Sequence, residues 1–564
     1  MMGHPLMQVK IASEPWEFEQ IHALNHQTFT GEIPQHAPSP SGRLVDRFHE
    51  DNVYVIGVRE RRVAGMIAIR HQRPFSLDHR LPNLDEYLPK GRAICELRLL
   101  AIEKGDRRGR LLPAIFDYVW RYCLGQGFDL AVISATTRQL ELYEHLGFVP
   151  FGPLVGTPEA QFQPMMLTLE RFAPRAPQLF RAASSEHRRE ACGGPARGAE
   201  PASDTMVSFL PGPTDVHAEV RRAFEAPAES HRSAVFEADF AAIGQSLCRI
   251  VEARRVAILL GSGTSANDAI AAQLSLHGAP GLILTNGEFG DRLVDHARRF
   301  KLTFDVLRQP WGAPFDLDAI RRTLASAPPR RGSPASPHGG GWLWFVQCET
   351  STGVLNDLDA VKTICSTAGV TLCVDAISSI GNVPVDLTGV SFASAVSGKG
   401  LRSFPGLALV FYHHELHPAP DALPRYLDLG LYATARGVPF THSSNLVRAL
   451  GAAVERVDWP ARFKAVDEAS AWLRARLRLL GFSIVAPEAH ASPGVVTIAL
   501  PGGVDSAAIG AALEKQGFLL SVNSAYLLDR NWVQICLMGE SSRAQLASVS
   551  NALFELCSRI ATGV

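Results

Sequence analysis

Apolar and polar positions along residues 1–171 predict a mixed α/β unit. The runs NVYVIGVRE, RVAGMIAIR and ICELRLLAI predict three successive strands. The stretch LLPAIFDYVWRYCLGQG has a helical apolar period that ends in glycine, and LAVISA after it predicts a further strand. We therefore expect an N-terminal domain over 1–171 in which helices pack on a mixed sheet.

The pattern after residue 204 is different, because short apolar runs alternate with helical stretches. The runs RVAILL, LILT, WLWFVQ, TLCVDA, FASAVS and LALVFY predict strands, and ANDAIAAQL, RLVDHARRF and LDAVKTICSTAG predict the helices between them. Crossover helices favour a mostly parallel sheet covered on both faces. We expect this large domain over 205–440. A long helical stretch and the runs FSIVA, GVVTIAL, FLLSV and WVQICLM then predict a connecting helix and a small α+β domain over 441–564.

The segment 172–204 separates the two patterns. It is rich in Ala, Pro, Arg, Gly and Ser and has no apolar period, so it cannot bury enough surface to hold a fold. We predict a flexible linker. A second such stretch, 327–341, interrupts the alternation of strands and helices and is expected to be a surface loop.

Composition agrees with a multidomain globular protein of 564 residues, with 46% hydrophobic and 20% charged residues. The formal net charge of −1 gives no reason to expect nucleic acid or an anionic membrane as partner, so small molecules are the expected partners. The N-terminus lacks a signal-peptide pattern, and no uninterrupted apolar run approaches the roughly 18 residues of a membrane span. We expect a cytoplasmic protein.

The nine cysteines are scattered and form no C-x-x-C pair. This spacing argues against a disulfide framework and against a structural zinc site. We expect reduced, mostly buried thiols and no metal.

Two charged residues stand in unusual places for their type. Lys399 lies between an apolar strand and a Gly-rich turn in AVSGKGLRSFPG, and Asp375 ends the apolar strand of TLCVDAISSIG. Carboxyl ends of parallel strands are where such sheets bind ligands. Pyridoxal 5′-phosphate (PLP) needs a lysine amine for its Schiff base and an acidic partner for its pyridine nitrogen. The pair therefore suggests PLP.

A glycine-rich turn adds a phosphate site. LLGSGTSANDAI places Ser262, Gly263 and Thr264 between a strand and a helix, where free N–H groups and hydroxyls point at one spot near a positive helix end. We expect these residues to hold a phosphate group.

The region after the linker resembles class V aminotransferases of PLP fold type I, most closely 2-aminoethylphosphonate–pyruvate and alanine/serine–glyoxylate transaminases. The resemblance runs through nearly all of this region. It rests on eight motifs in the family's order: FLPGPTDV, SHR, GSGT, NGEFGDR, CETSTGVLND, VDAISSIG, SGKGL and PFTHSS.

The resemblance implies a role for each matching residue. Lys399 forms the Schiff base and then transfers the proton, and Asp375 pairs with the pyridinium nitrogen. Thr350 binds the 3′-oxygen of the cofactor, while Phe289 either stacks on its ring or is an ordinary core residue. Thr441 binds the phosphate from the partner subunit, which implies a homodimer. Two weaker candidates, Glu349 and His231, either act in the site or only brace nearby backbone.

One position departs from the family pattern. Members that bind amino or keto acids carry an arginine in a C-terminal strand of the form R-I-G, whereas this chain has Gln534 in NWVQICLMG. A neutral amide cannot offer the charge-assisted fork of an arginine. Gln534 is thus the expected substrate-binding position. Either the substrate lacks an ordinary carboxylate, or Arg402 or Arg530 supplies the cation.

The N-terminal region, through WEFEQIHALNHQTF, ICELRLLAIE and QLELYEHLGFVPFG, is similar to the GNAT acyltransferases near N-acyl amino acid and acyl-homoserine-lactone synthases. Tyr143 would be the general acid for the departing thiolate, or else a core residue, and Glu96 is a candidate base. In place of the R-x-x-G-x-G loop that binds coenzyme A, this chain carries Leu111 and Pro113 where the glycines are expected. An acyl-carrier-protein thioester is therefore favoured over acetyl-CoA.

Together these features predict a transaminase that moves an amino group between a small amine or amino acid and a 2-oxo acid, fused to an acyltransferase that acylates an amine. The alternative keeps PLP in a lyase, decarboxylase or desulfurase and makes the N-terminal domain a degenerate acyl-binding module. A desulfurase needs an activated loop cysteine, and Cys348, next to a predicted strand, is a poor candidate.

Overall fold

The computed structural model describes residues 7–33, 35, 37, 39–107, 111–157, 160–172, 206–326, 341–435 and 437–562. The chain divides into two compact units, residues 1–201 with 475–481 and residues 202–474 with 482–564. The predicted linker after Phe172 and the predicted surface loop up to residue 340 lie outside the described residues.

The first unit is built on a mixed sheet of eight strands in the order β1-β2-β3-β4-β5-β8-β6, with β7 on β8. Only the β4–β5 pair is parallel. The predicted strands and the predicted helix are confirmed. The strands are β1 (Gln8–Ile11), β2 (Asn52–Arg59), β3 (Arg62–Arg70), β4 (Ile94–Ile102), β5 (Leu130–Thr136), β6 (Val149–Pro150), β7 (Val155–Thr157) and β8 (Ala160–Thr168).

The helices of this unit pack on the sheet through apolar side chains. Ile21 of α1 joins a core with Tyr54, Ile56 and Met66 of the strands. The helices are α1 (Pro15–His26), α2 (Leu84–Tyr87), α3 (Leu111–Gly125), α4 (Leu140–His145) and α5 (Leu169–Phe172).

The large sheet of the second unit has seven strands in the order β10-β18-β17-β16-β13-β11-β12. The four neighbouring pairs β17–β16, β16–β13, β13–β11 and β11–β12 are parallel. Strand β18 runs antiparallel to both of its neighbours, β10 and β17. The prediction of a mostly parallel sheet is therefore confirmed. The strands are β10 (Arg255–Leu260), β11 (Gly281–Thr285), β12 (Phe304–Arg308), β13 (Trp342–Val346), β16 (Thr371–Asp375), β17 (Phe392–Val396) and β18 (Leu407–Tyr412).

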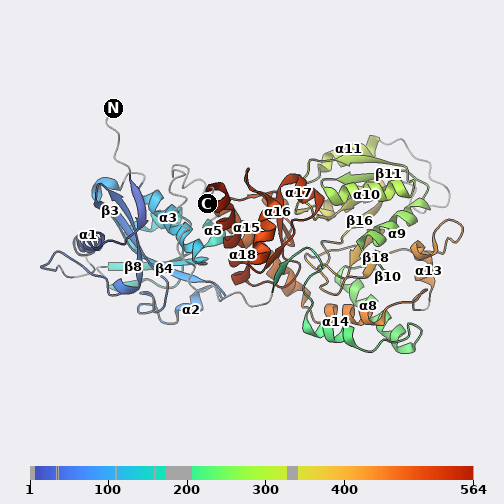
Figure 1. Ribbon diagram of the computed structural model, residues 1–564, viewed down its shortest axis with the longest axis horizontal. Coiled ribbons are helices and arrows are strands. Elements are labelled where there is room, and N and C mark those ends of the chain that lie inside the picture. Colours follow the sequence, from blue (N-terminus) through green and yellow to red (C-terminus); the bar gives the residue numbers. More distant parts are fainter. Residues whose placement is uncertain are drawn as a thin grey trace. The chain divides into compact units, whose positions relative to one another are not determined.

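Helices cover both faces of this sheet, and each face has its own apolar core. On one face, α9 and α10 bury residues such as Ile270 and Leu293; Figure 1 shows these two helices beside β11, β16 and β18. On the other face, residues such as Leu247 and Val361 come from α8 and α12. The helices are α7 (Ala218–Glu225), α8 (Ala234–Ile250), α9 (Gly263–Ser275), α10 (Glu288–Arg299), α11 (Leu317–Ser326), α12 (Leu358–Ala368) and α13 (Leu429–Thr434).

The C-terminal part is a small α+β region, as expected, with two differences in detail. The predicted connecting helix is two helices, α14 (Ser444–Glu455) and α15 (Trp459–Leu479). The strand β9 (Val207–Phe209), at the start of the predicted large domain, pairs in parallel with β21 (Phe518–Leu520) near the C-terminus. The remaining elements are β14 (Cys348–Glu349), β15 (Val354–Leu355), β19 (Ser483–Ile484), β20 (Val495–Ala499), β22 (Trp532–Cys536), α16 (Ser506–Lys515), α17 (Ala525–Arg530) and α18 (Arg543–Thr562).

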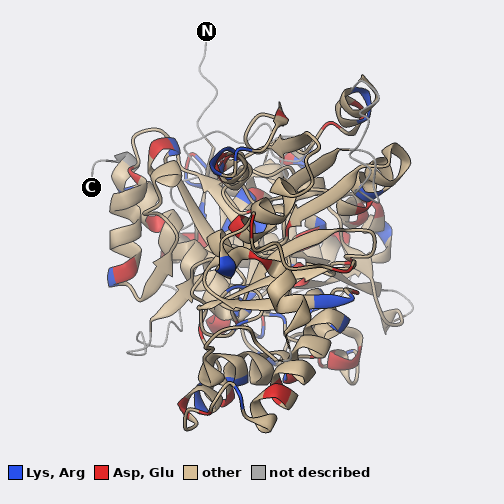
Figure 2. Cartoon of the chain, turned by 90° about the vertical axis from the view of Figure 1, so that its right-hand side faces the viewer, with Lys and Arg blue, Asp and Glu red and all other residues tan. Residues whose placement is uncertain are grey.

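Three general expectations concern cysteines, charge and membrane spans. Eight cysteines are free and buried, and Cys192 lies outside the described residues. Figure 2 shows basic and acidic residues interspersed over the elements in view, as the near-zero net charge implies. Among the helices that the structure describes, none combines the length and apolarity required to cross a bilayer.

Candidate active sites

The fold brings Lys399 and Asp375 to one edge of the large sheet. Asp375 is the last residue of β16, and Lys399 follows the end of β17, the parallel neighbour of β16. Because both strands run in the same direction, their carboxyl ends meet at the same edge, where doubly wound sheets bind ligands. The sheet topology therefore places Lys399 and Asp375 near each other.

A cavity of about 180 Å³ lies between these two residues. Its walls come from the N-terminal ends of α9 and α10, the loops after β13 and β16, and the Lys399 turn. The lining residues are Gly263, Thr264, Asn267, Phe289, Arg292, His296, Val346, Thr350, Asp375, Ile377, Ser378, Val396 and Lys399.

Asp375 is buried, with 4% of its surface exposed, and its two oxygens are held in place. The Asn267 Nδ2 donates to Oδ2 at 2.8 Å, and the Ile377 N–H donates to Oδ1 at 3.0 Å. Burial nevertheless raises the pKa of Asp375, because two neutral donors do not replace the lost hydration of a carboxylate. The carboxylate therefore has room for a cationic partner on the cavity side.

Lys399 is half-buried and donates from Nζ to the Ser378 Oγ at 3.0 Å. The Ser378 Oγ is in turn 2.5 Å from the Thr350 Oγ1. Burial lowers the pKa of the Lys399 amine, and the nearby Asp375 carboxylate opposes this shift. A larger fraction of this amine is thus unprotonated near neutral pH than for an ordinary lysine, which suits a nucleophile.

The predicted phosphate cradle forms the N-terminal end of α9. Ser262 caps the helix, and its N–H donates to the Ser265 side chain at 3.3 Å. Gly263 and Thr264 line the cavity. A Cβ on Gly263 would lie 2.7 Å from the end of the Ile377 side chain, so a larger residue here would require Ile377 to shift. The Ser262 and Ser265 N–H groups take part in a capping box, which leaves those of Gly263 and Thr264 as the first-turn donors placed to face an anion.

Phe289 and Glu349 build the neighbouring wall. The Phe289 ring lines the cavity, and its centroid is 5.4 Å from the Lys399 Nζ. Glu349 is fully buried and lies behind this wall: its carboxylate accepts from the N–H of Gly290 at 2.9 Å and of Phe289 at 3.3 Å. Of the two roles left open for Glu349, the contacts favour bracing the start of α10.

Two candidates lie outside this lining. Thr441 is exposed, which leaves its predicted role toward a partner subunit as a prediction. His231 is half-buried and lies near His442 rather than among the cavity residues.

Gln534 is also outside the lining, although it lies directly behind it. Its side chain is completely buried, and Nε2 donates to the Thr350 carbonyl at 2.6 Å, the Ser351 carbonyl at 3.2 Å and the Thr497 Oγ1 at 2.9 Å. The amide therefore faces the backbone of the loop that carries Thr350. A direct contact of Gln534 with substrate stays a prediction.

The two arginines considered as replacement cations are engaged elsewhere. Arg402 pairs with Glu540 at 3.0 Å, in a separate cavity with His217 and Arg456. The Arg530 guanidinium stacks 3.6 Å above the Trp311 ring. Within the cavity lining that the structure describes, the cationic side chains other than histidine are Lys399 and the half-exposed Arg292.

In the first unit, the parallel strands β4 and β5 pair only from Ile94 to Glu96. Beyond this point a cavity of about 60 Å³ opens between them, lined by residues that include Leu97, Ser134 and Tyr143. A cavity of about 360 Å³ shares part of this lining and continues to Arg107 and Arg138. The larger hollow has charged residues at its lining, where Arg107 pairs with Glu32 at 2.6 Å and Arg138 lies nearby.

Tyr143 stands in the smaller of these cavities with its ring edge-on to Phe148. Burial raises the pKa of the Tyr143 hydroxyl to about 12, so it remains protonated at neutral pH. That state is the one a general acid requires. Both alternatives for Tyr143 remain compatible with this position.

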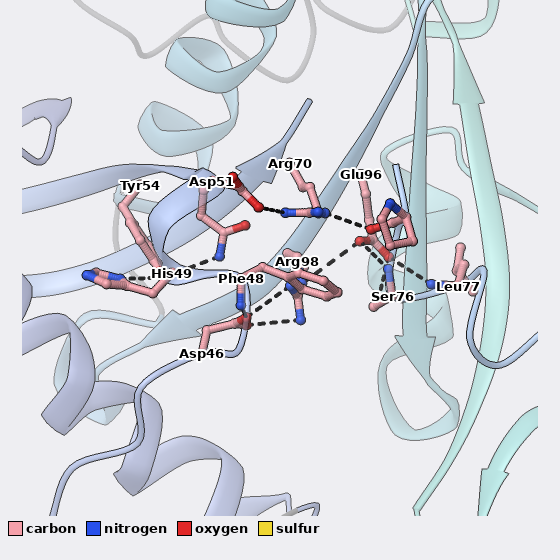
Figure 3. A network of polar contacts seen from close by, with 12 residues as sticks. Asp46, Phe48, His49, Asp51, Tyr54, Arg70, Ser76, Leu77, Glu96 and Arg98 are labelled. Carbon is pink, nitrogen blue, oxygen red and sulfur yellow. Dashed lines mark hydrogen bonds and ion pairs between the residues drawn. The ribbon is translucent and has the colours of Figure 1, made fainter. Parts of the chain in front are cut away.

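Glu96 belongs to a network of polar contacts shown in Figure 3. Its carboxylate accepts from the Ser76 N–H at 2.8 Å, from the Ser76 hydroxyl and from the Leu77 N–H at 3.3 Å. Arg98 lies 4.0 Å away and itself pairs with Asp46. Because both oxygens already accept hydrogen bonds, Glu96 fastens the loop at Ser76 to the sheet, which disfavours the role of a base.

The coenzyme A loop can be followed only in part. Residues 108–110 lie outside the described residues. Leu111 begins α3 and is 1% exposed, and a Cβ on Gly57 would collide with its side chain. Leu111 is therefore a core residue that holds α3 on β2. Pro113 lies in the first turn of the helix, where a missing N–H has no helical partner to lose.

Sequence reasoning missed four polar residues of the cavity lining: Asn267, Arg292, His296 and Ser378. All four lie in or close to motifs that were recognised, in ANDAI, NGEFGDR, the following helix and VDAISSIG. The helical spacing from the cradle could have identified Asn267, because its position in the second turn of α9 faces the strand ends. No comparable signal distinguishes Ser378 from its neighbour Ser379.

The cavity fits PLP in its donor set and in its unsatisfied groups. It combines a lysine amine of lowered pKa, a buried carboxylate whose two described hydrogen-bond donors are neutral, and the Gly263–Thr264 start of a helix. In addition, the Asn267 Oδ1 is buried without a hydrogen-bond partner in the cofactor-free chain.

Comparison with known proteins identifies both units. Residues 20–170 match the family of the N-acyl amino acid synthase FeeM. The chain is 31% identical over 326 residues to the soluble hydrogenase small subunit of Synechococcus sp., covering 56% of this chain and 83% of that protein. It is 30% identical over 314 residues to the 2-aminoethylphosphonate–pyruvate transaminase of Pseudomonas aeruginosa, covering 52% and 81% of the two chains.

Among solved structures, the alanine–glyoxylate aminotransferase of Nostoc sp. superposes with a TM-score of 0.55 at 25% identity. The match covers 63% of this chain and 96% of that one. The similarity therefore spans a complete aminotransferase chain, and the fold type inferred from the sequence is confirmed.

Proposed function

Because the chain belongs to the class V aminotransferase family and carries an N-acyl amino acid synthase FeeM domain ahead of it, we propose that it is a PLP-dependent transaminase joined to an N-acyltransferase. The observation that carries the proposal is the single cavity that holds Lys399 opposite Asp375. A buried lysine opposite a carboxylate suits PLP chemistry, and transaminase is the PLP-dependent activity carried by the relatives named above.

When bound, PLP would supply the electron-withdrawing ring that acidifies the C–H bond next to the amino group. The residues of this chain would do the rest. Asp375, oriented by Asn267, would keep a proton on the ring nitrogen. Lys399 would move the proton between the substrate carbon that bears the amino group and the cofactor carbon next to it. Phe289 would cover one face of the ring and exclude water.

The first turn of α9 would bind the phosphate group through Ser262, Gly263 and Thr264. Thr441 would complete this phosphate site from a second subunit, so the active form is a homodimer. The exposed position of Thr441 supports this proposal, since an exposed side chain is available to a partner.

The substrates would be a small amine or amino acid and a 2-oxo acid. Gln534 faces the Thr350 loop, while Arg402 and Arg530 are occupied by Glu540 and Trp311. The favoured donor therefore lacks an ordinary carboxylate beside the reacting carbon. An anionic group farther along the donor, such as a phosphonate, would compete with Glu288 for Arg292, which lines the cavity and is half-exposed.

The N-terminal unit would transfer an acyl group from an acyl-carrier-protein thioester to an amine, with Tyr143 as the proton donor to the departing thiolate. The two neighbouring hollows at β4 and β5 suit a phosphopantetheine arm and acyl chain, and Arg138 in the lining of the larger one suits an acidic carrier protein. The fusion suggests that the amine formed at Lys399 is the amine acylated here.

The alternative of a desulfurase is disfavoured. Burial raises the pKa of the Cys348 thiol to about 12, so it is not a nucleophilic thiolate at neutral pH.

The test is to reconstitute the protein with PLP, add a panel of amines and follow conversion of the lysine-bound cofactor to pyridoxamine phosphate by absorbance and mass spectrometry. Aminoethylphosphonate should convert the cofactor faster than alanine. Loss of CO₂ or sulfide from the donor, with the cofactor regenerated as PLP, would instead establish the lyase alternatives.

A further inference from the structure

Hydrogen bonds connect Lys399 to the Thr350 hydroxyl through Ser378, and Gln534 contacts the main chain of the same Thr350. The Lys399 Nζ donates to the Ser378 Oγ at 3.0 Å, and the Ser378 Oγ lies 2.5 Å from the Thr350 Oγ1. The carbonyl of Thr350 then accepts from the Gln534 Nε2 at 2.6 Å. Ser378, Thr350 and Gln534 are 3%, 2% and 0% exposed, so bulk water does not compete for these contacts.

Either hydroxyl can donate the hydrogen that lies between Ser378 and Thr350, and we take the arrangement in which Ser378, which already accepts from Lys399, donates it. One lone pair of the Ser378 oxygen accepts from Lys399, and a single hydrogen lies between the Ser378 and Thr350 hydroxyls. If Ser378 provides that hydrogen, the hydrogen of Thr350 is left to point into the cavity that both residues line. Lys399 then donates to Ser378, Ser378 donates to Thr350, and the Thr350 hydroxyl can donate to an acceptor bound in the cavity.

We propose that Ser378 is a positioning residue that holds the amine of Lys399 and, through Thr350, orients a hydrogen-bond donor into the cavity. This inference rests on the proposed function, in which Lys399 is the reactive amine. Gln534 then has a role behind the site. It holds the Thr350 peptide in place and therefore the position of the Thr350 hydroxyl.

The amide of Gln534 suits this role. Its nitrogen reaches the Thr350 and Ser351 carbonyls and the Thr497 hydroxyl, so it joins the Thr350 loop to β20. Among the described residues, none donates a hydrogen bond to the buried Gln534 Oε1. This unsatisfied oxygen lowers the stability of the folded protein, in exchange for the contacts that hold the Thr350 loop.

The contact between Ser378 and Lys399 has a measurable effect on the lysine. An oxygen that accepts from Nζ stabilises the ammonium form, because hydrogen bonding to the charged form favours it. Removing this oxygen should lower the pKa of Lys399 beyond the lowering that burial already causes. The other titratable and charged groups that face the amine or line its cavity are Asp375, Glu349, Cys348, Cys536, Arg292 and His296.

The experiment uses the full-length chain without added cofactor. Brief labelling with acetic anhydride across about pH 6 to 10, followed by peptide mass spectrometry, gives the pH midpoint at which Lys399 becomes reactive. Ser378→Ala should move this midpoint down by about one pH unit, the size expected for a lost hydrogen bond to a charged group. Ser378→Thr keeps the hydroxyl and should restore the original midpoint.

Ser379→Ala is the matched control. Ser379 is adjacent and equally buried, but its hydroxyl donates to the Gln347 side chain at 2.7 Å rather than contacting the lysine. Its midpoint should equal that of the wild type. Equal midpoints for Ser378→Ala and Ser379→Ala would overturn the inference, and so would a Ser378→Thr variant that behaves like Ser378→Ala.

Two further arms keep the result interpretable. If Ser378→Ala does not fold, Thr350→Val tests the same hydrogen bonds by removing the hydroxyl that contacts Ser378. An unchanged pH midpoint of Lys399 in that variant would contradict the proposed connection between Thr350 and Lys399. A parallel incubation of the wild type with PLP, reduced by borohydride, tests the proposed function separately. Failure to form an adduct on Lys399 would remove the proposed function while the labelling midpoints still decide the role of Ser378.

Discussion

Each unit of this protein buries a carboxylate on a central strand, and the two carboxylates differ in what surrounds them. Glu96 on β4 accepts three hydrogen bonds from Ser76 and Leu77 and has Arg98 nearby. Asp375 on β16 accepts from two neutral donors, and its pKa is raised by burial. Glu96 therefore fastens a loop, whereas Asp375 keeps capacity for a cation in a cavity.

The difference teaches that burial and charge alone do not identify a reactive group. A saturated carboxylate contributes to stability, because removing it strands several buried donors. An unsaturated one lowers stability until a ligand arrives, and this is the arrangement expected at a binding site.

Replacing Lys399 by alanine should abolish transamination while leaving part of the PLP affinity. The α9 turn and Asp375 would still hold the cofactor, whereas no other amine could take over proton transfer in the cavity. Rapid amine turnover assays and equilibrium dialysis with PLP measure the two effects. Residual turnover near the wild-type value would show that the reactive amine lies elsewhere.

Tyr143→Phe should reduce acyl transfer from a long-chain acyl carrier protein by about 10²- to 10⁴-fold, the range for a lost general acid. The ring remains, so packing against Phe148 should survive. Transfer is followed by mass spectrometry of the acylated amine, with acetyl-CoA as the comparison donor. Equal transfer in both proteins would favour the interpretation of Tyr143 as a core residue, and strong use of acetyl-CoA would contradict the preference for a carrier protein.

The contrast between the carboxylates is tested by a pair of variants. Glu96→Ala should weaken the protection of the Ser76 and Leu77 amides against hydrogen exchange by about 3 kcal/mol, because buried donors and a nearby arginine lose their partner. Asp375→Asn should leave exchange in its own unit nearly unchanged but lower transamination by about a hundredfold or more.

The exposed Glu86 serves as the control for the first of these variants, since Glu86→Ala should change the exchange free energies by less than about 0.5 kcal/mol. If Asp375→Asn instead destabilised its unit as strongly as Glu96→Ala destabilises the other, the distinction between a saturated and an unsaturated carboxylate would be wrong.

The smallest effect concerns Gln534. Gln534→Arg removes the contacts that hold the Thr350 loop, which should impair the native donor. A guanidinium that reaches the cavity from this position should improve kcat/KM for pyruvate or glyoxylate by roughly tenfold, because it binds their carboxylate. Steady-state kinetics with both oxo acids in both proteins provide the comparison. Unchanged efficiency would show that another cation already binds the carboxylate.

Much of the architecture follows from local pattern. Strands such as β10 and β16 are continuous apolar runs, which is how strands buried on both faces appear in sequence. The pairing of β9 with β21 could not be predicted, because it joins short segments far apart in the chain. A three-residue strand carries too little pattern to specify a distant partner.

The same limit applies to the site. The residues recognised from motifs, such as Lys399 and Asp375, are charged groups in apolar surroundings, so their sequence context is unusual. The contacts of Gln534 and the satisfaction of Glu96 depend on tertiary geometry, and nothing in the neighbouring letters reveals them. Ser378 and Ser379 are indistinguishable in sequence, yet only Ser378 contacts the lysine.

The most direct test of the central claim is to identify which lysine binds PLP. The full-length protein is incubated with PLP, reduced with borohydride and digested, and the pyridoxyl-bearing peptides are located by mass spectrometry. The account predicts a single major adduct on Lys399, strongly reduced in Asp375→Asn. A major adduct on any other lysine, or equal labelling of several surface lysines, would contradict it.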